Sequence, residues 1–162
     1  MAKRATRVNA DDRVVFAQLY RSLHRFASVV RPSEIEADDL LQEALVQSLR
    51  RQPLGELDNP GAYLRRTIIN LASNHRRRSA IGKAALRMEA HSASPGVYDS
   101  YPSDLSDLLA LTPVERAILY LVHVERYSFG EVAVVVGCSE VAARQKAARA
   151  RKKVRVSLEA PS

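Results

Sequence analysis

Arginines and lysines in one short stretch are the residues best suited to chemistry in this chain. Between Ser139 and Arg155 there are seven Lys or Arg and one acid, Glu140, so the stretch carries +6 where the whole chain carries +7. These side chains bind phosphate groups, and a stretch of one sign attracts a polyanion. A helix that serves only solubility normally mixes both signs. The stretch therefore predicts contact with nucleic acid, and a solvated basic helix is the plainer alternative.

A helix-turn-helix pattern positions these basic residues. Ser128 followed three residues later by Glu131 is a capping box that starts a short helix, and Gly137 provides the backbone freedom that ends it. Ser139 then caps the basic helix. The residues expected near the packing face of that helix are Val141, Ala148 and Val154. A short helix, a glycine turn and a basic helix predict a motif whose second helix enters a DNA major groove.

A second basic helix is predicted over residues 62–78, which contain five Arg and no acid. Asn59 before Pro60 predicts where it starts. Its expected buried stripe is Leu64, Ile68, Leu71, Ala72 and His75. Its opposite face shows Tyr63, Arg66, Asn70, Asn74 and Arg77. An aromatic ring, amides and guanidinium groups on one face can bind phosphates and stack on an unpaired base. A favourable interaction with the negative C-terminal end of the helix dipole would explain only the arginines at the end of this helix.

An acidic helix precedes it, since residues 33–49 contain five acids and no Lys or Arg. Ser33 and Glu36 predict a capping box ahead of a helix over residues 37–50. Its expected buried stripe is Ala37, Leu40, Leu41, Ala44, Leu45, Ser48 and Leu49. The outward residues are Asp38, Asp39, Gln42, Glu43, Val46 and Gln47. Helix-dipole effects fade after the first turn, so composition leaves a protein-docking surface and a solvated face equally open.

Composition indicates an all-α protein, because Ala, Leu, Arg and Glu are abundant while Gly is 6 and Trp is absent. A helical pattern over residues 14–30 and a capping box at Thr112 and Glu115, with Pro113 between them, add further helices. Residues 79–103 have linker composition. We therefore expect two small helical domains, residues 10–78 and 104–158, that a flexible linker allows to move relative to each other.

Several function classes are disfavoured by what the sequence contains. Cys138 is the only cysteine, and no apolar run approaches the length of a membrane span or of a signal-peptide core. The four histidines, His24, His75, His91 and His123, share no ligand spacing. There is no glycine loop suited to phosphates, and the acids of residues 33–49 have no catalytic partner. We expect a soluble cytoplasmic protein that is not an enzyme and uses no cofactor and no metal.

Over about residues 12–158 these segments resemble, in order, the extracytoplasmic-function sigma factors of the sigma-70 family. Residues 38–43, Asp-Asp-Leu-Leu-Gln-Glu, are similar to the core-binding motif of region two, and residues 63–78 to the promoter-melting helix. Residues 111–116 and 149–151 look like the start and the end of region four. The resemblance implies an alternative sigma factor that binds core RNA polymerase, directs it to promoters and opens DNA without ATP.

The resemblance also implies roles for individual residues. The clamp helices of the largest polymerase subunit would bind Asp39, Gln42, Glu43 and Val46. The minus-ten element would be bound by Tyr63, Arg66, Asn70, Asn74 and Arg77, with the loop at residues 53–59. The minus-thirty-five duplex would be bound by Ser139, Arg144, Gln145, Lys146, Arg149 and Lys152. The flap of the second-largest subunit, promoter DNA and an anti-sigma protein are the other implied partners.

Some positions depart from the pattern of the family. Tyr63 stands where the family usually has Trp, Asn74 where it often has an acid, and Ala142-Ala143 where it has Thr-Val. Alanines at the start of the basic helix remove a hydroxyl group, so the promoter preference of the family does not transfer, and base reading shifts toward Arg144 and Gln145.

Two other classes of protein remain as alternatives. A helix-turn-helix regulator that acts without polymerase, with residues 10–78 as a dimerisation domain, explains the basic helix but not the second basic, aromatic-bearing helix. A small RNA-binding helical protein is the other, because basic charge alone does not distinguish DNA from RNA.

Overall fold

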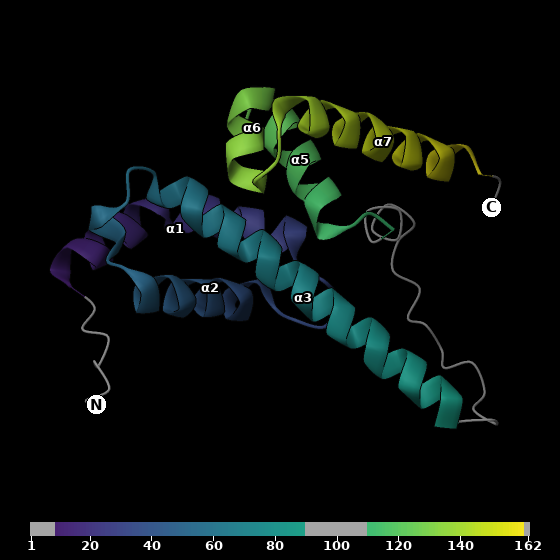
Figure 1. Cartoon of the computed structure of the whole chain (residues 1–162), viewed down its shortest axis with the longest axis horizontal. Coiled ribbons are helices and arrows are strands. Elements are labelled where there is room, and N and C mark those ends of the chain that lie inside the picture. The colour runs from purple at the N-terminus through teal and green to yellow at the C-terminus, as the bar shows by residue number, and fades with distance from the viewer. Residues whose placement is uncertain (1–8, 90–109, 161–162) are drawn as a thin grey trace.

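Every element in the computed structural model, which describes residues 9–89 and 110–160, is a helix (Figure 1). In chain order the elements are α1 (Ala10–Val30), α2 (Ala37–Arg51), the 3-10 helix η1 (Leu54–Glu56), α3 (Pro60–Glu89), α5 (Pro113–His123), α6 (Phe129–Val136) and α7 (Glu140–Glu159). The predicted all-α class is confirmed. Of the predicted linker, residues 79–89 belong to α3 and residues 90–103 lie outside the described ranges.

Helices α1, α2 and α3 pack on one another and bury large side chains at their centre. Leu23, Phe26, Leu40, Leu64 and Ile68 are fully buried there. Helix α2 begins at Ala37 as predicted, but its N-cap is Glu36 and makes no side-chain hydrogen bond. The predicted capping box at Ser33 is therefore wrong, because residues 33–35 form a turn before the helix instead of its first positions.

A buried carboxylate, which the sequence pattern did not predict, fixes η1 against α1. Asp12 is 3% exposed. Its Oδ1 accepts a hydrogen bond of 2.7 Å from the Leu54 backbone N–H, and its Oδ2 accepts one of 3.2 Å from Asn9. Leu54 is thereby held with its side chain fully buried. This interaction anchors the loop that leads into α3.

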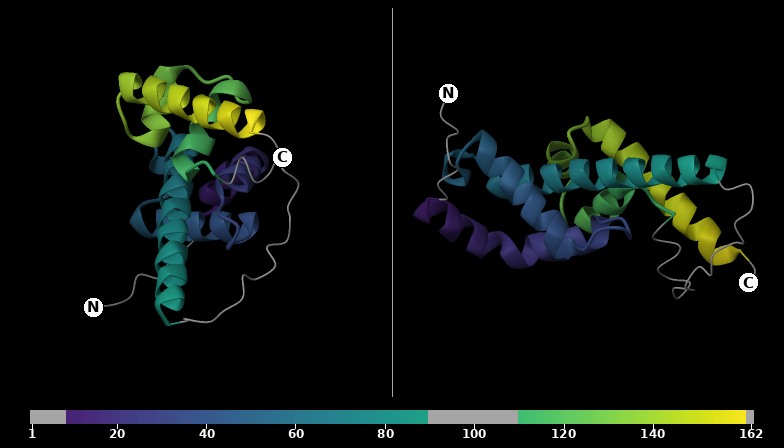
Figure 2. Two further views of the ribbon diagram at one scale, coloured as in Figure 1. Left: turned by 90° about the vertical axis from the view of Figure 1, so that its right-hand side faces the viewer. Right: turned by 90° about the horizontal axis from the view of Figure 1, so that it is seen from below.

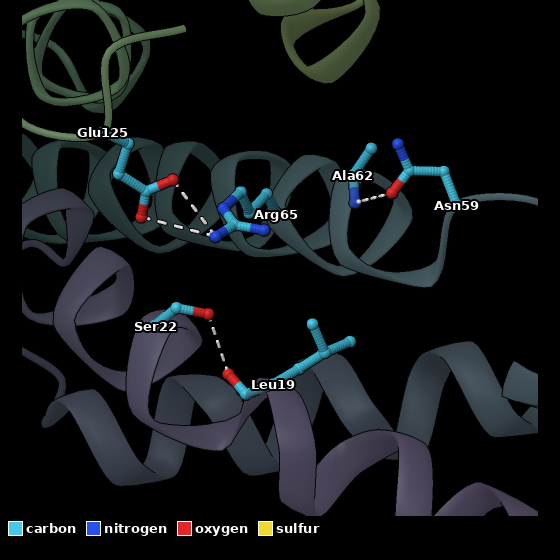
Figure 3. Close-up of polar contacts among 6 residues, drawn as sticks. All are labelled: Leu19, Ser22, Asn59, Ala62, Arg65 and Glu125. Atoms are coloured by element: carbon cyan, nitrogen blue, oxygen red, sulfur yellow. Dashed lines mark hydrogen bonds and ion pairs between the residues drawn. The ribbon is translucent and has the colours of Figure 1, made fainter.

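Helix α3 is longer than predicted. Asn59 caps it as expected, accepting a 3.0 Å hydrogen bond from the Ala62 N–H (Figure 3). The helix continues past residue 78 to Glu89. Figure 1 shows its C-terminal end projecting beyond the other helices, and residues 81–86 are exposed. The apolar periodicity weakens there because this end packs on no core, while alanine and lysine still favour helix.

Helices α5, α6 and α7 form the predicted helix-turn-helix with its supporting helix. The capping boxes at Thr112 and Ser128 are both present. Gly137 ends α6 with φ at +76°, and the Ser139 side chain accepts a 3.1 Å hydrogen bond from the Ala142 N–H. Helices α5 and α6 lie between α3 and α7 (Figure 2).

The predicted packing face of α7 is wrong. Val141 is 63% exposed, Ala148 is exposed and Val154 is half-buried. The residues that pack on α5 and α6 are Ala143, Ala147 and Ala150, all fully buried. Alanine spaced by four and three residues lets α7 approach its neighbours closely, and larger valines at those positions would not fit as tightly.

Both halves of the chain contribute to one continuous hydrophobic core, in which α1 contacts α5, and α3 contacts α5 and α6. A buried ion pair crosses this junction (Figure 3): Arg65 Nη2 lies 3.1 Å and 3.3 Å from the two carboxylate oxygens of Glu125. The Arg65 guanidinium also lies 5.8 Å from the ring centroids of Phe26 and Tyr127. The two halves therefore lie packed together, and their predicted relative movement stays a prediction.

Glu125→Gln should destabilise the protein strongly. The two side chains are only 6% and 15% exposed, so the substitution leaves a buried, uncompensated guanidinium, at a cost of about 3 kcal/mol. Chemical denaturation measures this free energy of unfolding. Glu140→Gln is the matched control because the Glu140–Arg144 pair is exposed, and we expect it to change stability by no more than about 0.5 kcal/mol. Equal effects of the two substitutions would contradict a structural role for the buried pair.

Candidate functional site

The outward face of α2 is exposed as predicted. Asp38, Asp39, Gln42, Glu43 and Gln47 are exposed, and Val46 is 48% exposed. Asp39, Gln42, Glu43 and Val46 line a shallow hollow of about 440 Å³, together with Gln47 and Arg50. The four residues with an implied polymerase-binding role are thus brought together on one surface, which combines carboxylates with an apolar centre.

Two histidines from neighbouring helices hold carboxylates of this face. His75 of α3 lies with its Nε2 2.8 Å from Glu43 Oε2, and His24 of α1 lies 3.1 Å from Asp38 Oδ1. His75 was predicted to be buried, but it is 26% exposed because its ring reaches out to Glu43. The Tyr20 hydroxyl donates a 3.2 Å hydrogen bond to Asp38, whose negative charge, with that bond, raises the pKa of Tyr20. Periodicity alone could not reveal these contacts between helices.

The outward face of α3 presents the predicted mixture of amides and arginines. Arg66, Asn70, Asn74 and Arg77 are exposed, and Tyr63 is half-buried. Arg77 donates a 2.6 Å hydrogen bond to the Asn74 side-chain oxygen. The spacing of three or four residues keeps all five along one side of the helix.

Arg66 connects this face to the helix-turn-helix. Its guanidinium lies against Gly137, so closely that a Cβ atom at Gly137 would be 2.6 Å from Arg66 Nη2. Two features thus favour glycine at position 137: its positive φ and the close approach of an arginine from α3.

The predicted phosphate-binding residues of α7 are all exposed. These are Ser139, Arg144, Gln145, Lys146, Arg149 and Lys152. Two of them also make local contacts: the Ser139 side chain caps the helix, and Arg144 lies 2.7 Å from Glu140 and 4.8 Å from the Phe129 ring centroid.

Lys153 differs from the other bases of α7 because it pairs with Glu115 of α5, at 2.6 Å. Burial alone would raise the pKa of Glu115, but hydrogen bonds from Lys153 and from the Thr112 N–H, with the lysine charge, lower it overall. A carboxylate with a lowered pKa stabilises the fold at neutral pH, and this contribution is lost as pH falls through its folded-state pKa.

An apolar hollow, which the sequence pattern did not predict, lies between α5 and α7. It has a volume of about 320 Å³ and is lined by Leu119, His123, Arg151, Val154, Arg155 and Leu158. Leu158 is 66% exposed at its edge. An exposed apolar surface with basic residues at its rim is suited to binding another protein.

Within residues 9–89 and 110–160, no group of three His, Cys, Asp or Glu side chains is arranged to hold a metal ion. In the same ranges, no helix is long and apolar enough to cross a membrane.

Comparison with known protein families matches both halves of the chain. Residues 15–80 match the family model of sigma-70 region 2, and residues 108–154 match that of sigma-70 region 4. Together these matches span most of the chain and include the surfaces of α2, α3 and α7. The fold and its surfaces thus define a two-region transcription initiation factor.

Relatives agree with this class. The extracytoplasmic-function RNA polymerase sigma factor SigM of Mycobacterium tuberculosis, from two strains, is 29% identical over 159 residues, covering 88% of this chain and 76% of the relative. The sigma factor RpoE of Bartonella quintana, solved in complex with the anti-sigma factor NepR, has a similar fold. Its TM-score is 0.67 at 19% identity, over 95% of this chain and 100% of that one. The chain belongs to the extracytoplasmic-function group of the sigma-70 family.

Gly137→Ala should destabilise the helix-turn-helix. The residue has a positive φ and Arg66 occupies the space of a side chain, so we expect a loss of at least about 1–2 kcal/mol in the free energy of unfolding. Gly82→Ala is the control, since no atom lies within 4 Å of its Cβ position in α3, and it should stabilise by up to about 1 kcal/mol.

Adding Arg66→Ala to Gly137→Ala separates the two causes. Partial recovery of stability would show the contribution of the arginine, and the remainder reports the backbone strain. If Gly137→Ala alone were as harmless as Gly82→Ala, the close approach of Arg66 would be refuted.

Proposed function

We infer that this chain acts as an alternative sigma factor, which binds core RNA polymerase, directs it to particular promoters and promotes DNA opening. One observation carries this conclusion: an acidic face on α2, an aromatic and basic face on α3 and a basic recognition helix α7 occur in one chain, in the order of regions 2 and 4. The protein acts by binding and not by catalysis, and it works in the cytoplasm with the polymerase.

We propose that the α2 face binds the clamp helices of the largest polymerase subunit. Asp39, Gln42 and Glu43 would supply the polar contacts and Val46 the apolar centre, which is the composition of a protein interface with a desolvated middle and a polar rim. His75 supports this role because it holds the Glu43 carboxylate in place. The hollow between α5 and α7 is the candidate contact for the flap of the second-largest subunit.

The DNA contacts are assigned to two helices. We propose that Tyr63, Arg66, Asn70, Asn74 and Arg77 of α3 bind the minus-ten element and hold an unstacked base of the non-template strand. Ser139, Arg144, Gln145, Lys146, Arg149 and Lys152 of α7 would bind the minus-thirty-five duplex. Capturing the unstacked strand offsets an opening cost of a few kcal/mol per step, so no ATP is needed.

The packed arrangement and promoter binding compete for one side chain. The Arg66 guanidinium lies against Gly137, and a contact of this group with melted DNA would draw it away from the turn. We therefore propose that the two regions separate, at least at α6, when the protein binds polymerase and promoter.

An anti-sigma protein is a proposed further partner. The similar RpoE structure is a complex with the anti-sigma factor NepR. The exposed apolar residues of the α5–α7 hollow and the α2 face would be suitable surfaces for such an inhibitor.

The first test is co-elution with sigma-free core polymerase in size-exclusion chromatography. Wild type should form a stable complex that supports run-off transcription, whereas Asp39→Arg with Glu43→Arg should not, because the substitution reverses both charges of the proposed interface. Asp11→Arg with Glu159→Arg is the matched control, since it reverses two exposed acids on other helices and should bind normally. Wild type that failed to bind core from its own organism would favour a regulator that acts without polymerase.

Lys146→Ala should reduce the salt dependence of duplex DNA binding. If Lys146 contacts one phosphate, the slope of log affinity against log salt concentration falls by about one unit. Lys153→Ala removes the same charge seven residues, or about two turns, further along α7, but this lysine pairs with Glu115. It should leave the slope unchanged and lower thermal stability instead. Equal slopes for the two variants would exclude the phosphate contact.

A further inference from the structure

A buried arginine at the junction of the two halves forms no ion pair with any residue that the structure describes. Arg116 of α5 is 6% exposed. Its Nη1 donates a 3.0 Å hydrogen bond to the Arg31 carbonyl at the end of α1, while its Nε is buried without a partner among the described residues. Burial, followed by the charges of Arg76 and Arg31, lowers the pKa of Arg116 to about 10, so the group remains charged at neutral pH.

Two acids that lie close in sequence to Arg31 and Arg116 pair with lysines. Glu115, the neighbour of Arg116 in the chain, binds Lys153 at 2.6 Å, and Glu34 binds Lys83 at 3.3 Å. Within the described part of the chain, neither Arg116 nor Arg76 forms an ion pair. Carbonyl groups satisfy single N–H donors of such arginines but do not neutralise their charge, so an excess of positive charge remains at the junction.

Arg76, whose charge acts on Arg116, lines a hollow of about 430 Å³. Its walls are Ser73, Arg76, Arg77 and Ala80 from α3, and Thr112 and Pro113 from the start of α5. One wall thus belongs to each half of the chain. The size is within the range of small-ligand sites, and arginines with hydroxyl groups and a helix start are the usual partners of phosphate.

We propose that this hollow binds a small ligand that carries two or more phosphate groups. Arg76 and Arg77 would bind the phosphate oxygens directly, and Ser73 and Thr112 would add hydroxyl donors. The positive charge of Arg116 at the same junction would also favour an anion. Since α3 and α5 each form a wall, the bound anion holds the two regions together and stabilises the packed form. The role of this effect rests on the proposed function, whereas ligand binding itself does not.

Titration calorimetry and thermal unfolding of the full chain with inorganic pyrophosphate, at constant ionic strength, test the site. Wild type should bind saturably with a Kd below about 1 mM and unfold at a higher temperature when pyrophosphate is present. Arg76→Gln should weaken binding by at least about tenfold, the usual loss for one charged hydrogen bond. Arg21→Gln removes one exposed arginine from α1, outside the hollow and the proposed DNA surfaces, and should stay within about twofold of wild type.

A second variant keeps the test decisive if Arg76→Gln, at a half-buried position, disturbs the fold. Arg77→Gln alters an exposed residue of the same hollow, and it should also weaken pyrophosphate binding while Arg21→Gln does not. No saturable binding to wild type, or equal losses in Arg76→Gln and Arg21→Gln, would overturn the proposal. Because neither DNA nor polymerase is present, such a failure leaves the assignment as a sigma factor intact.

Discussion

The ion pair between Arg65 and Glu125 is the constraint on which the arrangement of the two regions depends. It is buried, it joins residues 60 positions apart, and its guanidinium lies 5.8 Å from the ring centroids of Phe26 and Tyr127. A buried pair offsets its own desolvation only in a well-defined geometry, so it specifies one arrangement more than it adds stability. The relative position of α3 and the loop after α5 follows from this geometry.

Three consecutive residues of α3 make contacts in three different parts of the protein. Leu64 is fully buried in the core of the first region, Arg65 binds Glu125 across the junction, and Arg66 lies against the turn glycine of the helix-turn-helix. A rotation of α3 relative to α6 would change the last two contacts together. The proposed exposure of Arg66 to promoter DNA is therefore coupled to the loss of the buried ion pair, and a partner that compensates Glu125 or Arg65 would favour the separated form.

Most local predictions from the sequence are confirmed, with the capping box at Ser33 and the packing face of α7 as exceptions, whereas contacts between distant residues were missed. Capping boxes at Thr112 and Ser128, the cap at Asn59 and the turn at Gly137 depend on residues within three or four positions, and all are present. The outward faces of α2 and α3 followed from periodicity and are exposed apart from the half-buried Tyr63, whereas the proposed site residues of α7, also exposed, came from the resemblance. The contacts of Asp12 with Leu54 and of Arg65 with Glu125 join distant residues, and no spacing rule reveals them. The end of α3 was missed because it has no buried stripe.

The packing of α7 clarifies how its alanines affect DNA reading. Ala143, which stands where the resemblance implies Val, is fully buried against the other helices, so it belongs to the core and not to the DNA face. Only Ala142, half-buried in the first turn, removes a hydroxyl group from near the duplex. Base reading in the proposed complex then falls to Gln145 and Arg144, and Arg144 must leave Glu140 and Phe129 before it can reach a base edge. Promoter choice thus depends on how readily this local contact is exchanged for DNA.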